Sequence, residues 1–238
     1  MLNIVIALYI EAKPIIEYFK LKSSDGIYKN DKINLIITSY GKIKSAINTT
    51  LLLTNYKYPT LNFGIAGSNK FDINKGFFIH KIVDTDTNFN YYPDFFKQNS
   101  AILYTVSKPN RYYSLVDMEG SGFFEACYKF LNVNEIIVYK IVSDTPNYPI
   151  KKEIIPCLIK NHINIIEELL VEFEKKEDFF KEIEDYIQKV KTKMKLTKTQ
   201  ENQLKDRLTF YKIKHLSFPH IPTLKTKEEV KNFISSFF

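Results

Sequence analysis

The apolar residues of the first 145 positions form short runs, separated by polar turns and by segments with helical spacing. These runs cover residues 2–8, 33–38, 60–66, 76–84, 101–106 and 135–142. The first reads LNIVIAL, a near-continuous apolar pattern that is typical of a strand buried on both faces of a parallel sheet.

Segments with helical spacing alternate with these runs. One opens near Glu11, with Pro14 placed in the first turn, and another covers residues 42–55, with an apolar stripe at Ile43, Ala46, Ile47 and Leu51. A helix rich in small residues follows Glu119. The alternation predicts a three-layer α/β fold, in which helices flank a mostly parallel, twisted central sheet.

Helical patterns dominate from residue 151 onward. They cover residues 154–174, 178–195, 197–212 and 225–238, and Thr197 with Gln200 has the spacing of a capping box. We therefore expect an α/β domain at residues 1–170 and a basic, helical C-terminal extension at residues 171–238.

Composition adds few constraints. Of the 238 residues, 45% are hydrophobic and 26% are charged, as in an ordinary soluble protein, and no apolar run has the length of a membrane span. Without a signal-peptide pattern, we expect a cytoplasmic protein that does not contact a membrane. The two cysteines and four histidines lack the spacing of metal ligands, so no metal or cofactor is expected.

The net charge of +7 is concentrated near the C-terminus. Residues 189–231 contain twelve Lys and Arg against four acidic residues, a local excess of +8. Such a segment favours a solvated helical face, and nucleic-acid binding is the less favoured alternative.

Two acidic residues, Glu119 and Asp144, lie at the carboxyl ends of predicted strands or at the helix start just after them. Open α/β sheets place ligand sites at this edge. For each acid alone, a role as a helix N-cap or a dipole-satisfying residue is the simpler interpretation.

Five stretches, taken in order, carry a resemblance to a known family. They are the first strand leading to Glu11, then SYGKIKSA at residues 39–46, NFGIAG at 62–67, VDMEG at 116–120, and VSD at 142–144. In these stretches the chain resembles the purine nucleoside phosphorylase superfamily and, within it, the methylthioadenosine/S-adenosylhomocysteine nucleosidase branch. The match spans residues 1–165.

The resemblance implies a role for each matching residue. Asp144 would protonate the purine at N7, and Ser143 would orient that acid. Glu119 would bind the ribose 2′ and 3′ hydroxyls, with Met118 against the sugar. Glu11 would activate the attacking water. Ala66 and Gly67 would lie near the base and the water.

The resemblance leaves hydrolysis and phosphorolysis to be distinguished. Phosphorylases of this superfamily bind phosphate through arginine and serine, and Asn62 and Ile65 stand at the corresponding positions here. Since no arginine precedes Arg111, hydrolysis is favoured, with Lys42 as the nearest substitute phosphate ligand. The rivals are a phosphate-dependent phosphorylase and a non-catalytic protein that binds nucleosides or nucleic acid through the basic extension.

The expected partner is a small purine nucleoside, and a homo-oligomer is expected, with a dimer favoured. Two alternatives stay open for the aromatic loop at residues 88–99, which includes Phe89, Phe95 and Phe96. It either closes over a bound nucleoside or packs on a neighbouring element.

Overall fold

The computed structural model describes residues 1–95, 97, 99–109, 113–222 and 226–236. The chain divides into two compact units, Met1–Phe173 and Glu174–Phe238, whereas the sequence pattern placed the boundary at residue 171. The long helix α5 (Ile163–Lys193) contributes its first part to unit 1 and the rest to unit 2.

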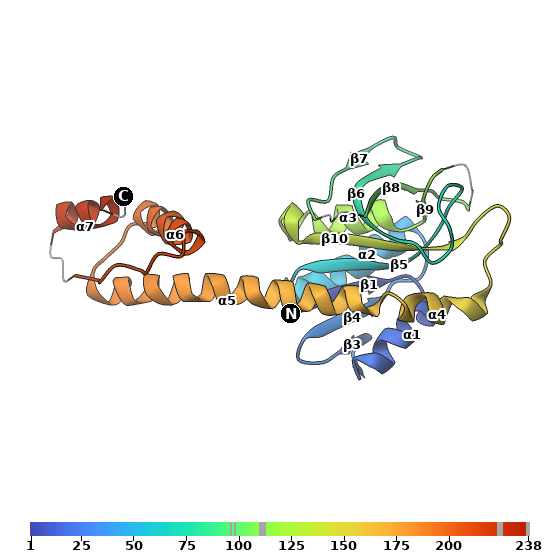
Figure 1. Cartoon of the computed structure of the whole chain (residues 1–238), viewed down its shortest axis with the longest axis horizontal. Coiled ribbons are helices and arrows are strands. Elements are labelled where there is room, and N and C mark those ends of the chain that lie inside the picture. Colours follow the sequence, from blue (N-terminus) through green and yellow to red (C-terminus); the bar gives the residue numbers. More distant parts are fainter. Residues whose placement is uncertain (96, 98, 110–112, 223–225, 237–238) are drawn as a thin grey trace. The chain divides into compact units, whose positions relative to one another are not determined.

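A parallel core forms the centre of the sheet in unit 1 (Figure 1). Here β4 (Ile33–Ile37), β1 (Leu2–Ile6), β5 (Thr60–Gly67) and β10 (Ile136–Asp144) lie side by side and run parallel. The strands β6 (Gly76–Asp84), β8 (Ser100–Thr105) and β9 (Val116–Asp117) are also parallel to one another.

Antiparallel pairings join these groups and extend the sheet. The β6 strand pairs with β10, and β9 pairs with β5, so these five strands close into a ring. At the β4 edge of the sheet, β2 (Lys22–Ser24) and β3 (Ile27–Lys29) form a hairpin that pairs with β4. The short strand β7 (Asn90–Tyr91) pairs with β6. Asp25 and Gly26, which connect β2 and β3, both have positive φ, as a tight hairpin turn requires.

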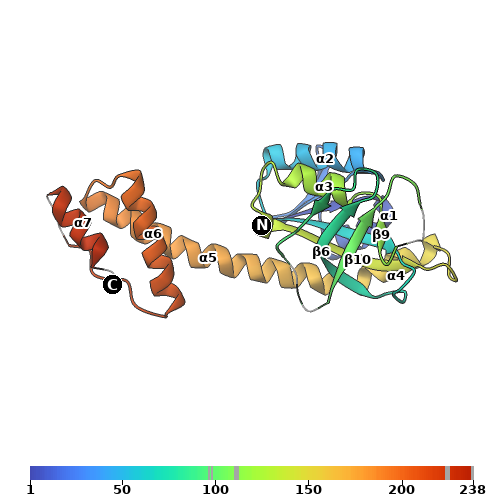
Figure 2. The same cartoon turned by 90° about the horizontal axis from the view of Figure 1, so that it is seen from above.

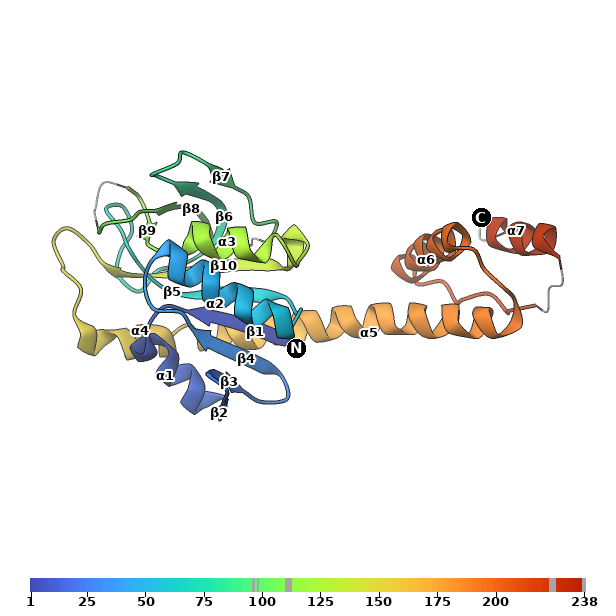
Figure 3. The same cartoon turned by 180° about the vertical axis from the view of Figure 1, so that it is seen from behind.

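Helices cover both faces of the sheet, which confirms the expected three-layer fold. One face carries α2 (Lys42–Asn55) and α3 (Gly120–Cys127), as Figure 2 shows from above and Figure 3 from behind. The other face carries α1 (Tyr9–Tyr18), α4 (Ile155–Lys160) and the start of α5. The short 3₁₀ turns Val133–Glu135 and Lys152–Ile154 precede β10 and α4.

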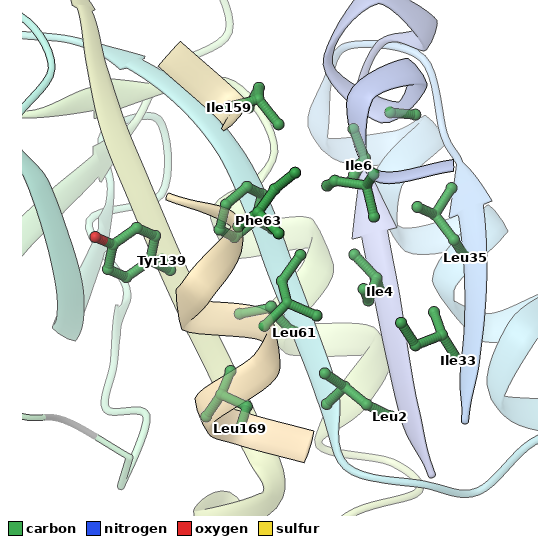
Figure 4. Close-up of a cluster of buried hydrophobic side chains, with 14 of the residues drawn as sticks. Leu2, Ile4, Ile6, Ile33, Leu35, Leu61, Phe63, Tyr139, Ile159 and Leu169 are labelled. Atoms are coloured by element: carbon green, nitrogen blue, oxygen red, sulfur yellow. The ribbon is translucent and has the colours of Figure 1, made fainter. Parts of the chain in front are cut away.

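The core between the sheet and the helices α1, α4 and α5 is apolar and almost fully buried. Figure 4 shows side chains from four neighbouring strands and from α4 and α5 meeting in one layer: Leu2, Ile4, Ile6, Ile33, Leu35, Leu61, Phe63, Tyr139, Ile159 and Leu169. Because each of these side chains is removed from water, the layer anchors the strand ends that carry the site.

Three helix expectations need correction. The first helix begins at Tyr9, so Pro14 lies inside it and not in its first turn. The predicted helices at residues 154–174 and 178–195 are replaced by α4 and by the single 31-residue α5. The stripe on α2 points outward, with Ile43 76% and Ile47 58% exposed, because α2 buries Ser45, Thr49, Leu52 and Leu53 instead.

Unit 2 has its own hydrophobic cluster. The end of α5 meets α6 (Lys198–Ile213) and α7 (Lys227–Ser235) through buried residues that include Ile187, Val190, Leu204 and Leu208. The capping box of Thr197 and Gln200 is present at the start of α6, as predicted. The predicted last helix was longer than α7, and its terminal residues 225, 237 and 238 lie outside the described residues.

Among the described helices, none has both the length and the apolar character that crossing a membrane requires.

Candidate active site

A cavity of about 840 Å³ opens at the carboxyl ends of β1, β5 and β10. The residues that line it come from widely separated parts of unit 1, as parallel strands that end at one edge make possible. All seven residues to which the resemblance assigned a role at the nucleoside or the water are among them: Glu11, Ala66, Gly67, Met118, Glu119, Ser143 and Asp144. The structure thus brings these residues together, while their roles stay predictions.

Glu11 enters the cavity from the first turn of α1, directly after β1. Its side chain lies against the backbone of β5, where the Ile65 N–H is 3.4 Å from Oε2. A Cβ atom at Gly64 would lie only 2.5 Å from the same oxygen, so glycine at that position makes room for the carboxyl group. Burial raises the pKa of Glu11 to about 8, opposed by the charge of Lys140 and assisted by that of Glu119.

Glu119 lies between β9 and α3 and lines the cavity. Its Oε1 accepts the Gly41 N–H at 2.9 Å, and its Oε2 accepts the Met118 N–H at 3.3 Å. Burial and the nearby Asp117 raise the pKa of Glu119, and Lys140 and these two N–H groups oppose the rise. Both oxygens keep lone pairs for further donors, such as the hydroxyl groups of a sugar.

Asp144 ends β10 next to an irregularity in the sheet. The β10–β5 register shifts between Val142 and Asp144, so Ser143 is an extra residue there. The Ser143 hydroxyl lies 2.7 Å from Asp144 Oδ1, within hydrogen-bond distance, and 3.3 Å from the Ala66 carbonyl oxygen. Gly67 faces the Asp144 carboxylate, since a Cβ there would lie 3.4 Å from Oδ2.

A buried lysine at the floor of the cavity was missed by sequence reasoning. Lys140 is 2% exposed, and its Nζ lies 3.0 Å from Asp117 Oδ2 and donates to Asn62 Oδ1 at 2.8 Å. Burial works against its charge, yet Asp117, Glu119 and Glu11 outweigh burial and raise the pKa of Lys140. A lone charged residue inside the apolar run IIVYKIV was the available signal, because a buried charge needs a partner.

Asp117 is the second cavity residue that the sequence did not indicate, and it pairs with Lys140. It accepts hydrogen bonds from Thr105 Oγ1 at 2.8 Å and from the Gly120 N–H at 2.9 Å, in addition to its ion pair with Lys140. Among the described residues that line the cavity, four are carboxylic acids and one is a cation, which is already bonded to one of them. This balance suits a ligand that becomes positively charged better than it suits a phosphate dianion.

The residues considered for phosphate binding do not present free donors to the cavity. Asn62 is not among the residues that line the cavity, and the side chain of Ile65 has no donor. Lys42 is not among the lining residues, and its Nζ donates to both oxygens of Asp84 at 3.1 Å and to Asp86 Oδ2. Arg111 lies outside the described residues.

In the described part of the aromatic loop, Phe95 and Tyr91 pack on other elements, whereas Phe89 is 63% exposed. Phe95 contacts the rings of Phe78 and Phe173, Tyr91 contacts Phe124, and Tyr92 lines a different cavity. Phe96 lies outside the described residues. Of the segment following β8, Val106 and Pro109 line the main cavity. Within the described residues, no three His, Cys, Asp or Glu side chains gather as a metal site would require.

Comparison with solved structures relates the fold of unit 1 to nucleosidases. No protein-family model matches the chain, and no curated protein matches it in sequence. Among solved structures, the 5′-methylthioadenosine/S-adenosylhomocysteine nucleosidase of Campylobacter jejuni is 15% identical over 73% of this chain and 98% of its own, with a TM-score of 0.60. The 5′-methylthioadenosine nucleosidase of Arabidopsis thaliana is 15% identical over 71% and 95%, with a TM-score of 0.59.

The nucleosidase of Helicobacter pylori, solved with butyl-thio-DADMe-Immucillin-A, is 18% identical over 72% of this chain and 97% of its own, with a TM-score of 0.53. At these identities the likeness concerns the fold. The α/β unit therefore has the fold of the methylthioadenosine/S-adenosylhomocysteine nucleosidases, and the resemblance inferred from the motifs is confirmed at that level.

Proposed function

We propose that this chain hydrolyses the N-glycosidic bond of a purine nucleoside. One observation carries the proposal: Glu11, Glu119 and Asp144 line the same cavity at the carboxyl edge of the sheet. Glu11 and Asp144 are more than 100 positions apart in the sequence. The shared fold supports it, because the structures of similar fold are named as nucleosidases of this type. An Asp-to-Asn mutant of the Helicobacter pylori nucleosidase was solved with 5′-methylthioadenosine in its active site.

The chemistry assigns a different task to each acid. The bond between the sugar C1′ and the purine nitrogen breaks, and its electron pair leaves with the base while Asp144 gives a proton to N7. The sugar then carries positive charge, which the Glu119 carboxylate and the ionised form of Glu11 stabilise electrostatically. Water adds its oxygen to C1′ and gives up a proton to Glu11, so the products are free base and free sugar.

The environments of the acids fit these tasks. A carboxyl group whose pKa is about 8 is half-ionised near that pH, which suits a group that receives a proton from water. Glu119 is held by the backbone N–H groups of Gly41 and Met118 and can accept the sugar hydroxyls with its other lone pairs. Ser143 stands where it can orient Asp144. Met118, Ala66 and Gly67 supply the remaining walls against the sugar and base.

Water is the favoured nucleophile because the cavity lacks a donor set for phosphate among its described lining residues. Its one cation, Lys140, is committed to Asp117 and Asn62, and phosphate would meet four carboxyl groups. A free cationic group would be expected in a site that binds phosphate tightly.

The test is release of free base from a panel of purine nucleosides in phosphate-free buffer. We expect turnover by the natural chain and a loss of about 10²-fold or more in Asp144→Asn, since the amide cannot transfer the proton. Asp94→Asn is the matched control, because Asp94 lines another cavity, and it should keep full activity. Full activity in Asp144→Asn would remove the acid from the mechanism, and turnover that strictly requires phosphate would indicate a phosphorylase.

A further inference from the structure

The start of α2 holds one of the hydrogen-bond donors that orient Glu119. Gly41, the residue before the helix, gives its N–H to Glu119 Oε1 at 2.9 Å. Its backbone has φ +103° and ψ 146°, a conformation that side-chain-bearing residues rarely adopt. The direction of this N–H therefore depends on how the chain is held on either side of Gly41.

The following residue, Lys42, is held by two carboxylates. Its Nζ donates to Asp84 Oδ1 and Oδ2 at 3.1 Å each and to Asp86 Oδ2 at 2.5 Å. Asp84 is 4% exposed at the end of β6, so this side of the contact belongs to the rigid sheet. Burial alone would raise the pKa of Asp84, but hydrogen bonds from Ser121 and Lys42 lower it to about 2, which keeps the pair charged at ordinary pH.

The same aspartate also holds the helix that follows Glu119. Ser121 Oγ, two residues beyond Glu119, donates to Asp84 Oδ2 at 2.6 Å. The backbones of the two helices touch, because a Cβ atom at Gly122 would lie 2.1 Å from the Lys42 carbonyl oxygen. Asp84 therefore contacts the chain on both sides of the Gly41–Glu119 hydrogen bond. Lys42 connects it to the donor side, and Ser121 connects it to the acceptor side.

We propose that the Lys42–Asp84 ion pair is a positioning device, which holds the Gly41 N–H on Glu119 and so sets the carboxylate for the sugar hydroxyls. Lys42 lies outside the cavity, so its charge acts through backbone geometry and not by touching the ligand. This inference rests on the proposed function for its link to catalysis. A small displacement of a group that binds the reacting sugar costs far more in rate than in stability.

The first measurement needs no substrate. Amide exchange of Gly41 is followed by NMR in the natural chain, in Lys42→Met and in Lys42→Arg. We expect exchange about 10-fold faster in Lys42→Met, because the hydrogen bond opens more often, and near-natural exchange in Lys42→Arg, whose guanidinium can bridge both carboxylates. Unchanged exchange in Lys42→Met overturns the proposal. Asp86→Asn, which removes only the more exposed partner, is the milder variant should Lys42→Met fail to fold.

The second measurement connects the pair to the sugar. The ratio of kcat/KM for a purine ribonucleoside to that for its 2′,3′-dideoxy analogue should fall about 10-fold in Lys42→Met, since only the ribonucleoside has hydroxyls for Glu119. A purely structural defect would lower both values equally, and an unchanged ratio would overturn the proposal. Lys13→Met, which removes the exposed pair with Glu17, should leave both readouts unchanged. If the natural chain releases no base, the proposed function is refuted. The positioning role is still tested in that case, because the amide exchange of Gly41 is measured without substrate.

Discussion

At the scale of single residues, Glu11 is expected to activate water, and burial of its ionised form lowers the stability of the fold. Its pKa is raised to about 8 from 4.5, so the folded chain holds the proton more tightly than the unfolded chain does. The contribution of Glu11 to the free energy of unfolding should therefore be largest at or below pH 4.5. This contribution should be lost as the pH rises through about 8.

We predict that Glu11→Gln melts several degrees higher than the natural chain at pH 9 and loses this difference near pH 4.5, while it no longer activates water. Thermal unfolding across this pH range measures the effect. Glu17→Gln, an exposed position on the same helix, is the control and should follow the natural profile. A Glu11→Gln variant whose melting curve tracks the natural chain at every pH would contradict the burial argument.

Lys140 should contribute strongly to the stability of the fold because its charge compensates buried carboxylates. Replacing it with Met leaves Asp117 without its ion-pair partner in a dry environment, which should cost about 3–5 kcal/mol in the free energy of unfolding. Denaturant titration gives this value. The double variant Lys140→Met/Asp117→Asn should recover part of the loss, and equal stability of Lys140→Met and the natural chain would refute the pairing as a structural requirement.

At the scale of elements, α2 shows what a sequence pattern can and cannot specify. Gly41 and the helical spacing after it predicted the bounds of the helix correctly, because local backbone preferences decide where a helix starts. The side that is buried was not predictable from apolarity, since close contact with α3 at Gly122 favours the small side chains of Ser45 and Thr49. The apolar stripe at Ile43, Ile47 and Leu51 is left exposed.

We propose that this stripe is a contact between two copies of the chain, in line with the homo-oligomer expected from the resemblance. Ile47→Lys should convert a dimer to a monomer in light scattering, because a charge would then be placed at the centre of the contact. Val171→Lys, at an exposed apolar position on α5, is the matched control and should leave the mass unchanged. A natural chain that is monomeric at all concentrations would rule this contact out.

The part of the candidate site that lies at the carboxyl ends of strands was predictable from the sequence. Glu119 and Asp144 were found from the strand-end rule, and the motif order added Glu11, Met118, Ser143, Ala66 and Gly67. Lys140 and Asp117 were not found as a pair. The lone charge in the run IIVYKIV indicates that a partner is needed, but which residue it is depends on the register that places Lys140 opposite Gly64 and on β9 closing against β5. Such long-range register is a property of the assembled sheet and has no local signature.

At the scale of the whole molecule, the proposed chemistry belongs to unit 1, which supplies every residue of the cavity. Unit 2 has a separate hydrophobic cluster and contains the whole Lys-rich segment at residues 189–231. The uneven charge of the sequence thus reflects the second unit, and the cavity of the first unit is rich in carboxylates. This separation is why net charge was a poor guide to the ligand.

The most direct test of the account identifies the sugar product that the natural chain forms when phosphate is present. Phosphorus NMR and a reducing-sugar assay are applied to the same reaction. We expect one free sugar for each purine released and no sugar phosphate, because water is the proposed nucleophile. Formation of sugar 1-phosphate in step with the base would contradict it.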